Sequence, residues 1–360
     1  MRIAFLSSST GWGGLERNLL RYAQWMKEIG HQVELNCVQG SPIEVTASTT
    51  MLPVRCIPRQ RRHFPLAAAK TLNQHLQQSL TDFLWIRDPR DLSLCSLAVS
   101  GTSVDLLFHQ GMQIPRPKTK PWHHFRFRRI SRWIAPLNHL RDEALANTPL
   151  KPTQIEVIPL ALDSNWFTAP RTAEAKTHWG IPPHAQTVGL FGRIDPLKGH
   201  STLIRALTES GDAWHALIIG ENTPNANRDY RFELQELAQT LDVAHRVHWH
   251  SPTEALLSAY DACDAYAMCS TSETIGMVTI EALARKVPVL GTNAGGTPEL
   301  LGFGTQGTLF DPGDWNALAL ALQRIESRPV ADDAHVEQFS KSGALKKWSE
   351  TLATIRPSAS

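Results

Sequence analysis

Two carboxylates eight residues apart carry the densest chemical signal in the chain. Glu273 and Glu281 lie where a polar turn follows an apolar run and leads into a helical pattern. The first N–H groups of that helix, at Gly276, Met277 and Val278, form a natural seat for a phosphate. Carboxylates beside an anion site favour hydroxyl groups, such as a ribose diol and a sugar. The alternative is that Glu273 is only a helix-start charge and Glu281 a solvated surface residue.

Two cations stand in a second polar stretch. Arg193 and Lys198 lie within Gly192–His200, which directly follows an apolar run. At the carboxyl edge of a parallel sheet, two such cations can neutralise a diphosphate. The same stretch can also be read as an exposed loop with ordinary charges.

A glycine turn follows the first apolar run of the chain. Gly13 and Gly14 belong to the sequence Gly-Trp-Gly-Gly, whose spacing differs from the Gly-x-Gly-x-x-Gly of dinucleotide folds. No carboxylate ends the second predicted strand, where the chain reads Cys-Val-Gln-Gly40. These departures argue against a nicotinamide or flavin enzyme. A turn without side chains still admits a phosphate or sugar beside its backbone.

His109 follows the apolar run Val104–Phe108 and is expected at a sheet edge. A buried, hydrogen-bonded structural histidine is the commoner case, so this position by itself is a weak signal. The other histidines show no metal-ligand spacing. The sequence therefore predicts no metal site and no cofactor.

These residues need a scaffold of alternating strands and helices. A strand, a glycine turn, a helix over Leu15–Ile29 and a second strand predict a βαβ unit and a parallel sheet. The second half repeats this order, including a helix over Met277–Ala284. The sequence predicts two Rossmann-like, doubly wound α/β domains, over 1–163 and 164–341, joined through a linker within 159–185. The predicted strands cover Ile3–Leu6, Val33–Val38, Phe83–Ile86, Val104–Phe108, Ile155–Pro159, Thr187–Phe191, Ala216–Gly220, Val247–Trp249, Ala265–Met268 and Val287–Gly291.

The end of the chain carries two further predictions. A last helix over 342–355 is expected to pack back on the first domain. The tail Arg356–Ser360 is expected to be disordered. In doubly wound folds, ligands bind in the crevice outside the carboxyl ends of the strands.

Composition excludes several classes of protein. The chain has 360 residues, 42% apolar and 19% charged, which excludes a disordered or fibrous protein. No apolar run approaches the ~20 residues of a membrane helix. Five cysteines without a C-x-x-C pair indicate a reducing compartment, so we expect a soluble, cytoplasmic protein.

The charge is unevenly distributed. Residues 1–160 carry 20 Lys and Arg against 11 Asp and Glu, a balance of +9, whereas the rest carries 16 against 23, a balance of −7. Much of the positive charge lies between 116 and 133, where Arg126, Arg128 and Arg129 alternate with aromatic residues. Such a segment is typical of contact with an anionic membrane surface or acidic lipid. The alternative is a solvated helix with one apolar side.

Taken together, these segments resemble the retaining glycosyltransferases of family four, which have the GT-B fold of two Rossmann-like domains. Each motif is modest alone, but their order and spacing over nearly the whole chain are specific. The motifs are Gly-Gly-Leu-Glu-Arg at 13–17, Gly-His-x-Val at 30–33, Arg193 and Lys198, the pair Glu273 and Glu281, Pro288-Val289, Gly-Gly-x-Pro-Glu at 295–299, and Gly307 through Pro312-Gly313-Asp314.

The resemblance implies a nucleotide-diphosphate sugar donor, with UDP favoured, bound mostly by the second domain. It assigns the diphosphate to Arg193 and Lys198, with backbone N–H donors from Gly276, Met277 and Val278. It assigns the ribose hydroxyls to Glu281 and the transferred sugar to Glu273. Gly13 and Gly14 would close over the diphosphate, and His109 would lie near the anomeric carbon. The implied reaction retains configuration and needs no metal, because cations and a helix dipole stabilise the departing diphosphate.

Three positions depart from the family pattern. Leu160-Ala161 replaces the usual Asn-Gly of the linker, Thr274 replaces a glycine beside Glu273, and Lys286 stands where a glycine commonly ends the helix. A non-glycine residue in a left-handed cap costs roughly 1 kcal/mol. None of the three removes a charged group that the chemistry needs.

The basic first half suggests a membrane-associated or anionic acceptor, such as a lipopolysaccharide core or a lipid-linked glycan. We therefore expect a cytoplasmic protein that lies peripherally at the inner face of the membrane. A nucleotide-sugar epimerase of the same fold is the first alternative, and a catalytically silent sugar-nucleotide-binding protein is the second. Nucleic-acid binding is the weakest, because the basic segment is short and the second half is acidic.

Overall fold

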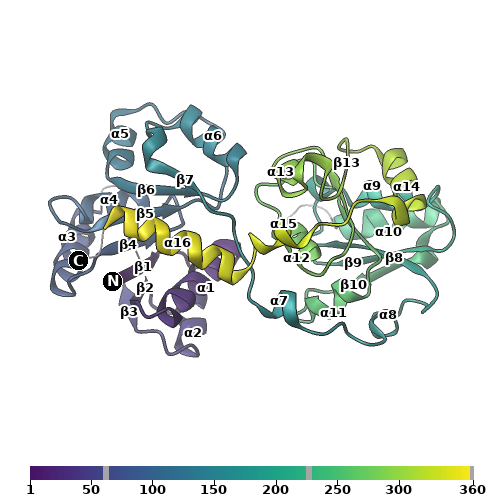
Figure 1. Cartoon of the computed structure of the whole chain (residues 1–360), viewed down its shortest axis with the longest axis horizontal. Coiled ribbons are helices and arrows are strands. Elements are labelled where there is room, and N and C mark those ends of the chain that lie inside the picture. The colour runs from purple at the N-terminus through teal and green to yellow at the C-terminus, as the bar shows by residue number, and fades with distance from the viewer. Residues whose placement is uncertain (60–64, 224–228, 357–360) are drawn as a thin grey trace. The chain divides into compact units, whose positions relative to one another are not determined.

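The computed structural model describes residues 1–59, 65–223 and 229–356, and its chain divides into two compact units. Unit 1 comprises Met1–Pro159 and Leu345–Ser360, and unit 2 comprises Leu160–Ala344 (Figure 1). The division falls after residue 159, whereas the sequence placed it after residue 163. Leu160 and Ala161, which replace the usual Asn-Gly of the linker, are buried. Within the described residues, no helix is long and apolar enough to cross a membrane.

Unit 1 is built on a seven-stranded sheet in which every described strand pair is parallel. The strand order is β3-β2-β1-β4-β5-β6-β7. The four residues of β4 are all buried, as expected for a parallel strand covered on both faces. The strands are β1 (Arg2–Ser7), β2 (Gln32–Val38), β3 (Val54–Ile57), β4 (Phe83–Ile86), β5 (Asp105–His109), β6 (Ile130–Ala135) and β7 (Ile155–Val157).

Helices connect these strands, as parallel pairing requires. The first, α1 (Gly14–Glu28), is amphipathic, and its apolar face, including Leu19 and Met26, is buried. The other connecting helices are α2 (Pro42–Ser48), α3 (Leu66–Gln78), α4 (Leu92–Ala98), α5 (Pro121–Arg128) and α6 (Asn138–Asn147).

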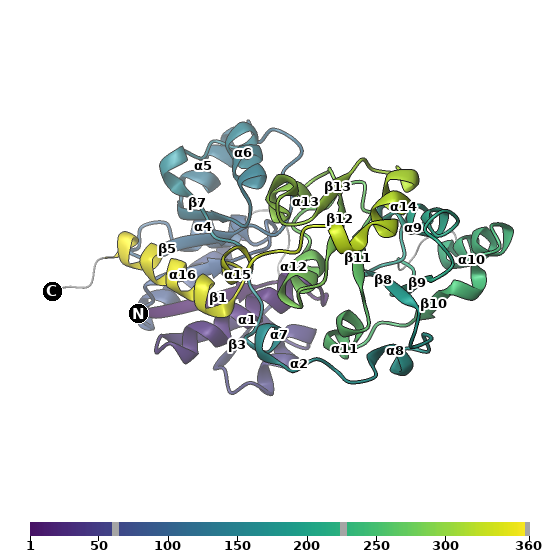
Figure 2. The same ribbon diagram turned by 45° about the vertical axis from the view of Figure 1, so that its right-hand side comes forward.

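The last helix of the chain, α16 (Lys341–Ile355), lies along the strands of unit 1 (Figure 1, Figure 2). The indole of Trp348 is fully buried, and its ring centroid lies 3.9 Å from that of Trp85 in β4. Arg356 pairs with Asp82 and Asp105 at 2.7 Å each. The prediction of a disordered tail is therefore wrong for Arg356, whose guanidinium meets two carboxylates at the starts of strands. The remaining tail, 357–360, lies outside the described residues.

Unit 2 carries a six-stranded parallel sheet in the order β10-β9-β8-β11-β12-β13. Its strands are β8 (Gln186–Phe191), β9 (Trp214–Ile219), β10 (Val247–His250), β11 (Ala265–Met268), β12 (Val289–Thr292) and β13 (Thr308–Phe310). Its helices are α7 (Asn165–Thr168), α8 (Ala175–His178), α9 (His200–Ala206), α10 (Tyr230–Thr240), α11 (Leu256–Asp261), α12 (Met277–Ala284), α13 (Thr297–Leu300), α14 (Trp315–Gln323) and α15 (Asp333–Glu337).

The predicted fold class, two parallel α/β units, is confirmed. The bounds of β4, β11 and α12 agree with the prediction. The basic segment 116–133 differs from the single solvated helix considered as one alternative. It contains α5 and then β6, whose Trp133 is buried, because the apolar residues that follow Arg129 pair with β5.

Candidate functional site

Two loops at the carboxyl ends of β8 and β11 bring Lys198 and Glu273 together. The Nζ atom of Lys198 lies 2.5 Å from Oε2 of Glu273. The Ser270 hydroxyl donates to the same carboxylate oxygen at 3.3 Å. The Lys198 and Glu273 side chains are 25% and 14% exposed, so both are partly shielded and still reach the surface. Two residues that the sequence assigned to diphosphate and sugar are therefore neighbours.

Two glycines let these loops pack against each other. Gly199 has φ +70°, and a Cβ there would lie 2.1 Å from the carbonyl oxygen of Cys269. Gly295 has φ +58°, and a Cβ there would lie 2.1 Å from the carbonyl oxygen of Glu273. That same oxygen accepts a hydrogen bond from the N–H of Gly296 at 2.8 Å. The Gly295-Gly296 motif thus fixes the backbone of Glu273.

The loop that carries Glu273 leads into the N-terminus of α12. Gly276 precedes the helix in a left-handed conformation, with φ +82° and ψ +55°. Its carbonyl accepts from the N–H of Thr279 at 2.9 Å, which begins the helical hydrogen bonding. The N–H groups of Met277 and Val278 belong to the first turn, where a helix provides no acceptor and its dipole is positive. This end of α12 can hold an anion.

Glu281 lies one turn further along α12 and meets Tyr260 of α11. The buried Tyr260 hydroxyl is 2.9 Å from Oε2 of Glu281 and also 2.9 Å from the carbonyl oxygen of Val278. Burial, and then the charge of Glu281, hold the pKa of Tyr260 well above its ordinary value. Tyr260 therefore stays protonated and orients the carboxylate. Sequence reasoning missed Tyr260, because a single tyrosine in an apolar helix carries no motif.

Arg193 stands on the same loop as Lys198 and is exposed. Its guanidinium makes no hydrogen bond or ion pair to the residues that the structure describes. Asp195 fixes the loop, since its carboxylate accepts from the N–H of Leu197 and from the hydroxyl of Thr223, both at 2.9 Å. The Leu197 N–H is the main reason that the pKa of Asp195 is lowered, with smaller contributions from Arg193 and Lys198. The loop thus presents two cations at the sheet edge.

In unit 1, Gly13 and Gly14 lie at the start of α1, after β1. The Gly13 N–H donates to Oε2 of Glu16 at 2.9 Å. Gly13 has extended backbone, with φ −149°, and a Cβ on Gly14 would meet nothing within 4 Å. No contact within the described residues therefore requires glycine at either position.

His109 ends β5, but its imidazole is fully buried among the rings of Tyr22, Trp85 and Trp348. A guanidinium N–H of Arg87 donates to Nδ1 of His109 at 2.7 Å, which puts the imidazole proton on Nε2. Burial and the Arg87 charge lower the pKa of His109 well below its ordinary value. His109 is a neutral hydrogen-bond donor in the core of unit 1, where it has no accessible atom to contact a substrate.

Two further charged groups, which sequence reasoning missed, follow β4. Arg87 is 2% exposed, and burial lowers its pKa to about 10. Asp91 is 1% exposed and accepts hydrogen bonds from the hydroxyl and N–H of Ser8, and burial raises its pKa to about 7. Perturbed charges of this kind cluster at functional sites. The run of charges directly after the apolar strand was the available signal.

Two family models match the chain. One, described as "Glycosyltransferase Family 4", covers residues 12–166, and the other, "Glycosyl transferases group 1", covers residues 172–345. The chain belongs to these glycosyltransferase families. The gap between the two matched regions, residues 167–171, lies near the start of unit 2. The first region contains β2 to β7, and the second contains β8 to β13.

Two curated relatives of this chain share one name. A D-inositol 3-phosphate glycosyltransferase of Segniliparus rotundus is 32% identical over 222 residues, covering 55% of this chain and 49% of the relative. The protein of the same name from Nocardia farcinica is 33% identical over 218 residues, covering 55% of this chain and 48% of the relative. The chain thus matches about half the length of these curated relatives.

Solved structures show the fold over the full length. A glycosyltransferase from Rickettsia africae aligns with a TM-score of 0.86 at 20% identity, covering 99% of each chain. HepE of Anabaena in complex with UDP aligns with a TM-score of 0.85 at 23% identity, covering 98% of this chain and 100% of that one. The lipopolysaccharide outer core galactosyltransferase WaaB aligns at 0.77 and 15% identity, covering 98% and 99%. The family member therefore has the GT-B fold that its sequence predicted.

Proposed function

We propose that the chain is a retaining glycosyltransferase, which moves a sugar from a nucleotide diphosphate, with UDP favoured, to a glycan or lipid-linked acceptor. One observation carries the proposal: Lys198, Glu273 and the N-terminus of α12 converge at one sheet edge, with Glu281 one turn along the helix. These groups match the parts of a nucleotide sugar. The structure of HepE from Anabaena in complex with UDP-glucose, a protein of the same fold, supports the choice of donor.

Each donor-site residue has a defined task in this proposal. Arg193 and Lys198 neutralise the diphosphate, and the N–H groups of Gly276, Met277 and Val278 donate to its oxygens. Glu281, oriented by Tyr260, accepts from the ribose hydroxyls. Glu273 accepts from hydroxyls of the transferred sugar. No contact among the described residues requires glycine at Gly13 or Gly14, and in this proposal the absence of side chains there lets the diphosphate approach the backbone.

The reaction breaks one bond and forms one. The bond between the anomeric carbon and the diphosphate oxygen breaks, and its electron pair leaves with the diphosphate. The acceptor hydroxyl oxygen bonds to the anomeric carbon on the same face, and its proton passes to the departing diphosphate, which retains configuration. Arg193, Lys198 and the positive end of α12 stabilise the negative charge that develops, and we propose that this stabilisation suffices without a metal.

His109 has a narrower role than a general base. Its Nδ1 atom already accepts from Arg87, so the ring can act only through its Nε2–H group, which is buried. In this proposal His109 supports the acceptor side as a hydrogen-bond donor, and Arg87 positions it. A side-chain movement is needed for direct contact, because the imidazole is fully buried.

The proposals about the acceptor and about membrane contact rest on the basic segment 116–133. Arg128 is exposed, and Arg129 lies over the ring of Phe125 with its guanidinium 5.6 Å from the centroid. Arg126 instead points into unit 1 and is half-buried, so the expected surface of three arginines reduces to two. We propose that Arg128 and Arg129 contact an anionic membrane from the cytoplasmic side. If charge reversal of both leaves binding to anionic vesicles unchanged, this contact is wrong.

Relatives indicate two acceptor classes. The curated relatives are named for inositol 3-phosphate, and WaaB is named for the lipopolysaccharide outer core. Both classes offer a sugar or polyol hydroxyl near an anionic group. We propose an acceptor of this kind.

The deciding experiment incubates the pure protein, in EDTA, with UDP-, GDP- and ADP-sugars and follows release of free nucleotide. We expect slow release from one donor, lost in Lys198→Ala and Glu281→Ala. It should persist in Arg205→Ala, which removes an exposed cation of α9 away from the site. Release that depends on added metal contradicts metal independence.

Calorimetry on the same panel separates the remaining outcomes. Donor binding without turnover shows that the acceptor is required for the reaction. Recovery of an epimerised sugar from the donor identifies an epimerase instead. Binding to none of the donors overturns the transferase and favours a catalytically silent protein.

A further inference from the structure

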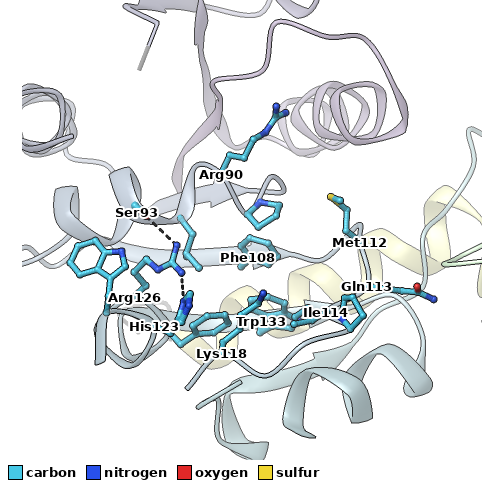
Figure 3. Close-up of a pocket in the computed structure, with 15 residues that line it drawn as sticks. Arg90, Ser93, Phe108, Met112, Gln113, Ile114, Lys118, His123, Arg126 and Trp133 are labelled. Atoms are coloured by element: carbon cyan, nitrogen blue, oxygen red, sulfur yellow. Dashed lines mark hydrogen bonds between the residues drawn. The ribbon is translucent and has the colours of Figure 1, made fainter. Parts of the chain in front are cut away.

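Unit 1 contains a cavity of about 500 Å³ that the donor chemistry does not use. It lies between the strands β5 and β6 and the helices α4 and α5 (Figure 3). Its floor is aromatic: the rings of Phe108 and Trp133 stack with centroids 4.1 Å apart, and Phe127 stacks on Trp133 at 5.7 Å. A cavity of this volume holds a small molecule, and a floor of this kind takes an apolar group.

Cations line the same cavity, and no Asp or Glu is among its lining residues. Arg126 donates to the hydroxyl of Ser93 at 3.1 Å and to Nδ1 of His123 (Figure 3). Its Nε atom is buried and has no hydrogen-bond partner among the residues that the structure describes. Lys118 lines the cavity as well, whereas Arg90 at the rim already pairs with Asp88.

Arg126 is a half-buried cation that no carboxylate neutralises within the described residues. Its neighbours Ser93 and His123 are neutral partners, and burial lowers its pKa. Charged groups withdrawn from water are costly unless an opposite charge pairs with them. An anion held between Arg126 and Lys118 would provide that charge.

The cavity is also lined by residues that follow the carboxyl end of β5, such as Met112 and Gln113. Phe108, in the floor, and His109 are consecutive residues of β5. The next residue, Gln110, accepts from Nε1 of Trp133 at 2.8 Å and donates to the carbonyl oxygen of Met112 at 3.0 Å. One continuous set of contacts therefore joins the cavity floor to the carboxyl edge of the sheet, where ligands bind in this fold.

We infer that this cavity binds the acceptor through an anionic group, a phosphate or a carboxylate, that is attached to an apolar group. The inference rests on the proposed transferase function for the word acceptor. Arg126 and Lys118 hold the anion, and the stacked rings of Phe108 and Trp133 hold the apolar part. A ligand with only the anionic group, or only the apolar group, would make only one of these two sets of contacts.

The test measures binding of four probes by calorimetry in the absence of donor. Phenyl phosphate carries both features, benzoate replaces the phosphate by a carboxylate, benzyl alcohol is apolar and neutral, and inorganic phosphate has no apolar group. We expect phenyl phosphate or benzoate to bind about tenfold or more tightly than either benzyl alcohol or inorganic phosphate. The tighter of the two identifies the anionic group. Equal binding of benzyl alcohol, or no binding of any probe, overturns the inference.

Matched variants locate the site. Arg126→Gln and Lys118→Gln should each weaken binding of the better anionic probe about tenfold, because each removes one charge from the cavity. Lys70→Gln removes an exposed charge from α3 of the same unit, outside the cavity lining, and should change the affinity less than twofold. An equal loss in Arg126→Gln and Lys70→Gln overturns the inference in favour of general surface charge. If Arg126→Gln does not fold, Lys118→Gln alone still tests whether a cation of the cavity binds the anionic probe.

Separate readouts distinguish failure of the cavity from failure of the transferase. Probe binding that persists with saturating UDP, in a protein that turns over no nucleotide sugar, supports the cavity and overturns the transferase. Turnover of a nucleotide sugar without probe binding overturns only the cavity. Competition between the probe and UDP places the probe in the donor site and also overturns the inference.

Discussion

The proposed chemistry needs the negative charge of Glu273, whereas the ion pair of Glu273 with Lys198 adds little to the free energy of unfolding. Its ion pair with Lys198 is partly exposed, and exposed pairs contribute about 0–1 kcal/mol to the free energy of unfolding. Its carboxylate would face the positive charge that develops on the sugar. Substitution should therefore separate activity from stability.

We predict that Glu273→Gln lowers the rate of nucleotide release by roughly 100-fold or more, since removal of one electrostatic group costs about this much. The free energy of unfolding in urea should change by less than about 1 kcal/mol. Glu236→Gln, at an exposed position of α10, is the control for loss of a carboxylate. Full activity in Glu273→Gln would remove the residue from the reaction.

The buried carboxyl of Asp91 should make the free energy of unfolding depend on pH. Burial raises its pKa from 3.8 to about 7, so the folded chain keeps this proton to a higher pH than the unfolded chain. The stabilisation is complete below pH 4 and is lost as the pH rises through 7, with a slope of up to about 1.4 kcal/mol per pH unit. Asp91→Asn, which stays neutral, should remove this dependence.

The measurement is urea unfolding of both proteins between pH 4 and 8. The stability of Asp91→Asn relative to the unsubstituted protein should increase as the pH rises, because only the unsubstituted protein must ionise a buried carboxyl. A difference that stays constant across this range would show that Asp91 does not titrate there. Because the other titrating groups are the same in both proteins, their contributions cancel in the difference between the two free energies of unfolding.

At the scale of elements, contacts between loops position Glu273 in the proposed donor site. The Gly295-Gly296 turn after β12 supports the backbone of Glu273, which belongs to the loop after β11. The sequence analysis noted Lys286 at a position where a glycine commonly ends the helix. Lys286 indeed has the left-handed backbone conformation that glycine favours, with φ +56°. Its Nζ atom pairs with Asp333 at 2.5 Å.

We predict that Gly295→Ala lowers activity at least tenfold, because its Cβ would lie 2.1 Å from the Glu273 carbonyl oxygen and would displace that loop. Gly313→Ala is the matched control, since Gly313 has φ +83° with nothing within 4 Å of its Cβ. Both should lose roughly 1–2 kcal/mol of stability from backbone strain. Activity equal in the two variants would contradict support of Glu273 by Gly295.

At the scale of the whole molecule, the chain returns from unit 2 to complete unit 1. Trp348 of α16 is fully buried against Trp85, Tyr22 and His109. The last described residue, Arg356, closes this contact through Asp82 and Asp105. The stability of unit 1 therefore depends on residues at the far end of the sequence.

We predict that Trp348→Ala lowers the free energy of unfolding by about 3–5 kcal/mol, the usual cost of emptying a buried aromatic site. Trp12→Ala removes an indole that is 37% exposed and should cost less than about 1 kcal/mol. In scanning calorimetry, the variant should show a transition for unfolding of unit 1 at a lower temperature than the unsubstituted protein. At temperatures above this transition and below the unfolding of unit 2, the variant should still bind the donor. Loss of donor binding at the same temperature would contradict independent units.

The basic segment shows how local patterning can mislead. The alternation of arginines and aromatics predicted a surface, yet Phe127 and Trp133 became the floor of a cavity and Arg126 its cation. Periodicity reports which residues are apolar, but not which element covers them. Only the pairing of β6 with β5 placed these rings inside.

The sequence by itself determined the two parallel α/β units, the bounds of α12 and the left-handed Lys286, because apolar runs, helix-start residues and caps act over a few neighbouring positions. The tertiary structure decided which loops meet. Lys198 and Glu273 are 75 residues apart, and the pairing of β8 with β11, together with the close packing of their loops, brings them to 2.5 Å. The burial of His109 and of Asp91 likewise depends on strands and a helix that are distant in sequence, and their pKa values follow from that burial.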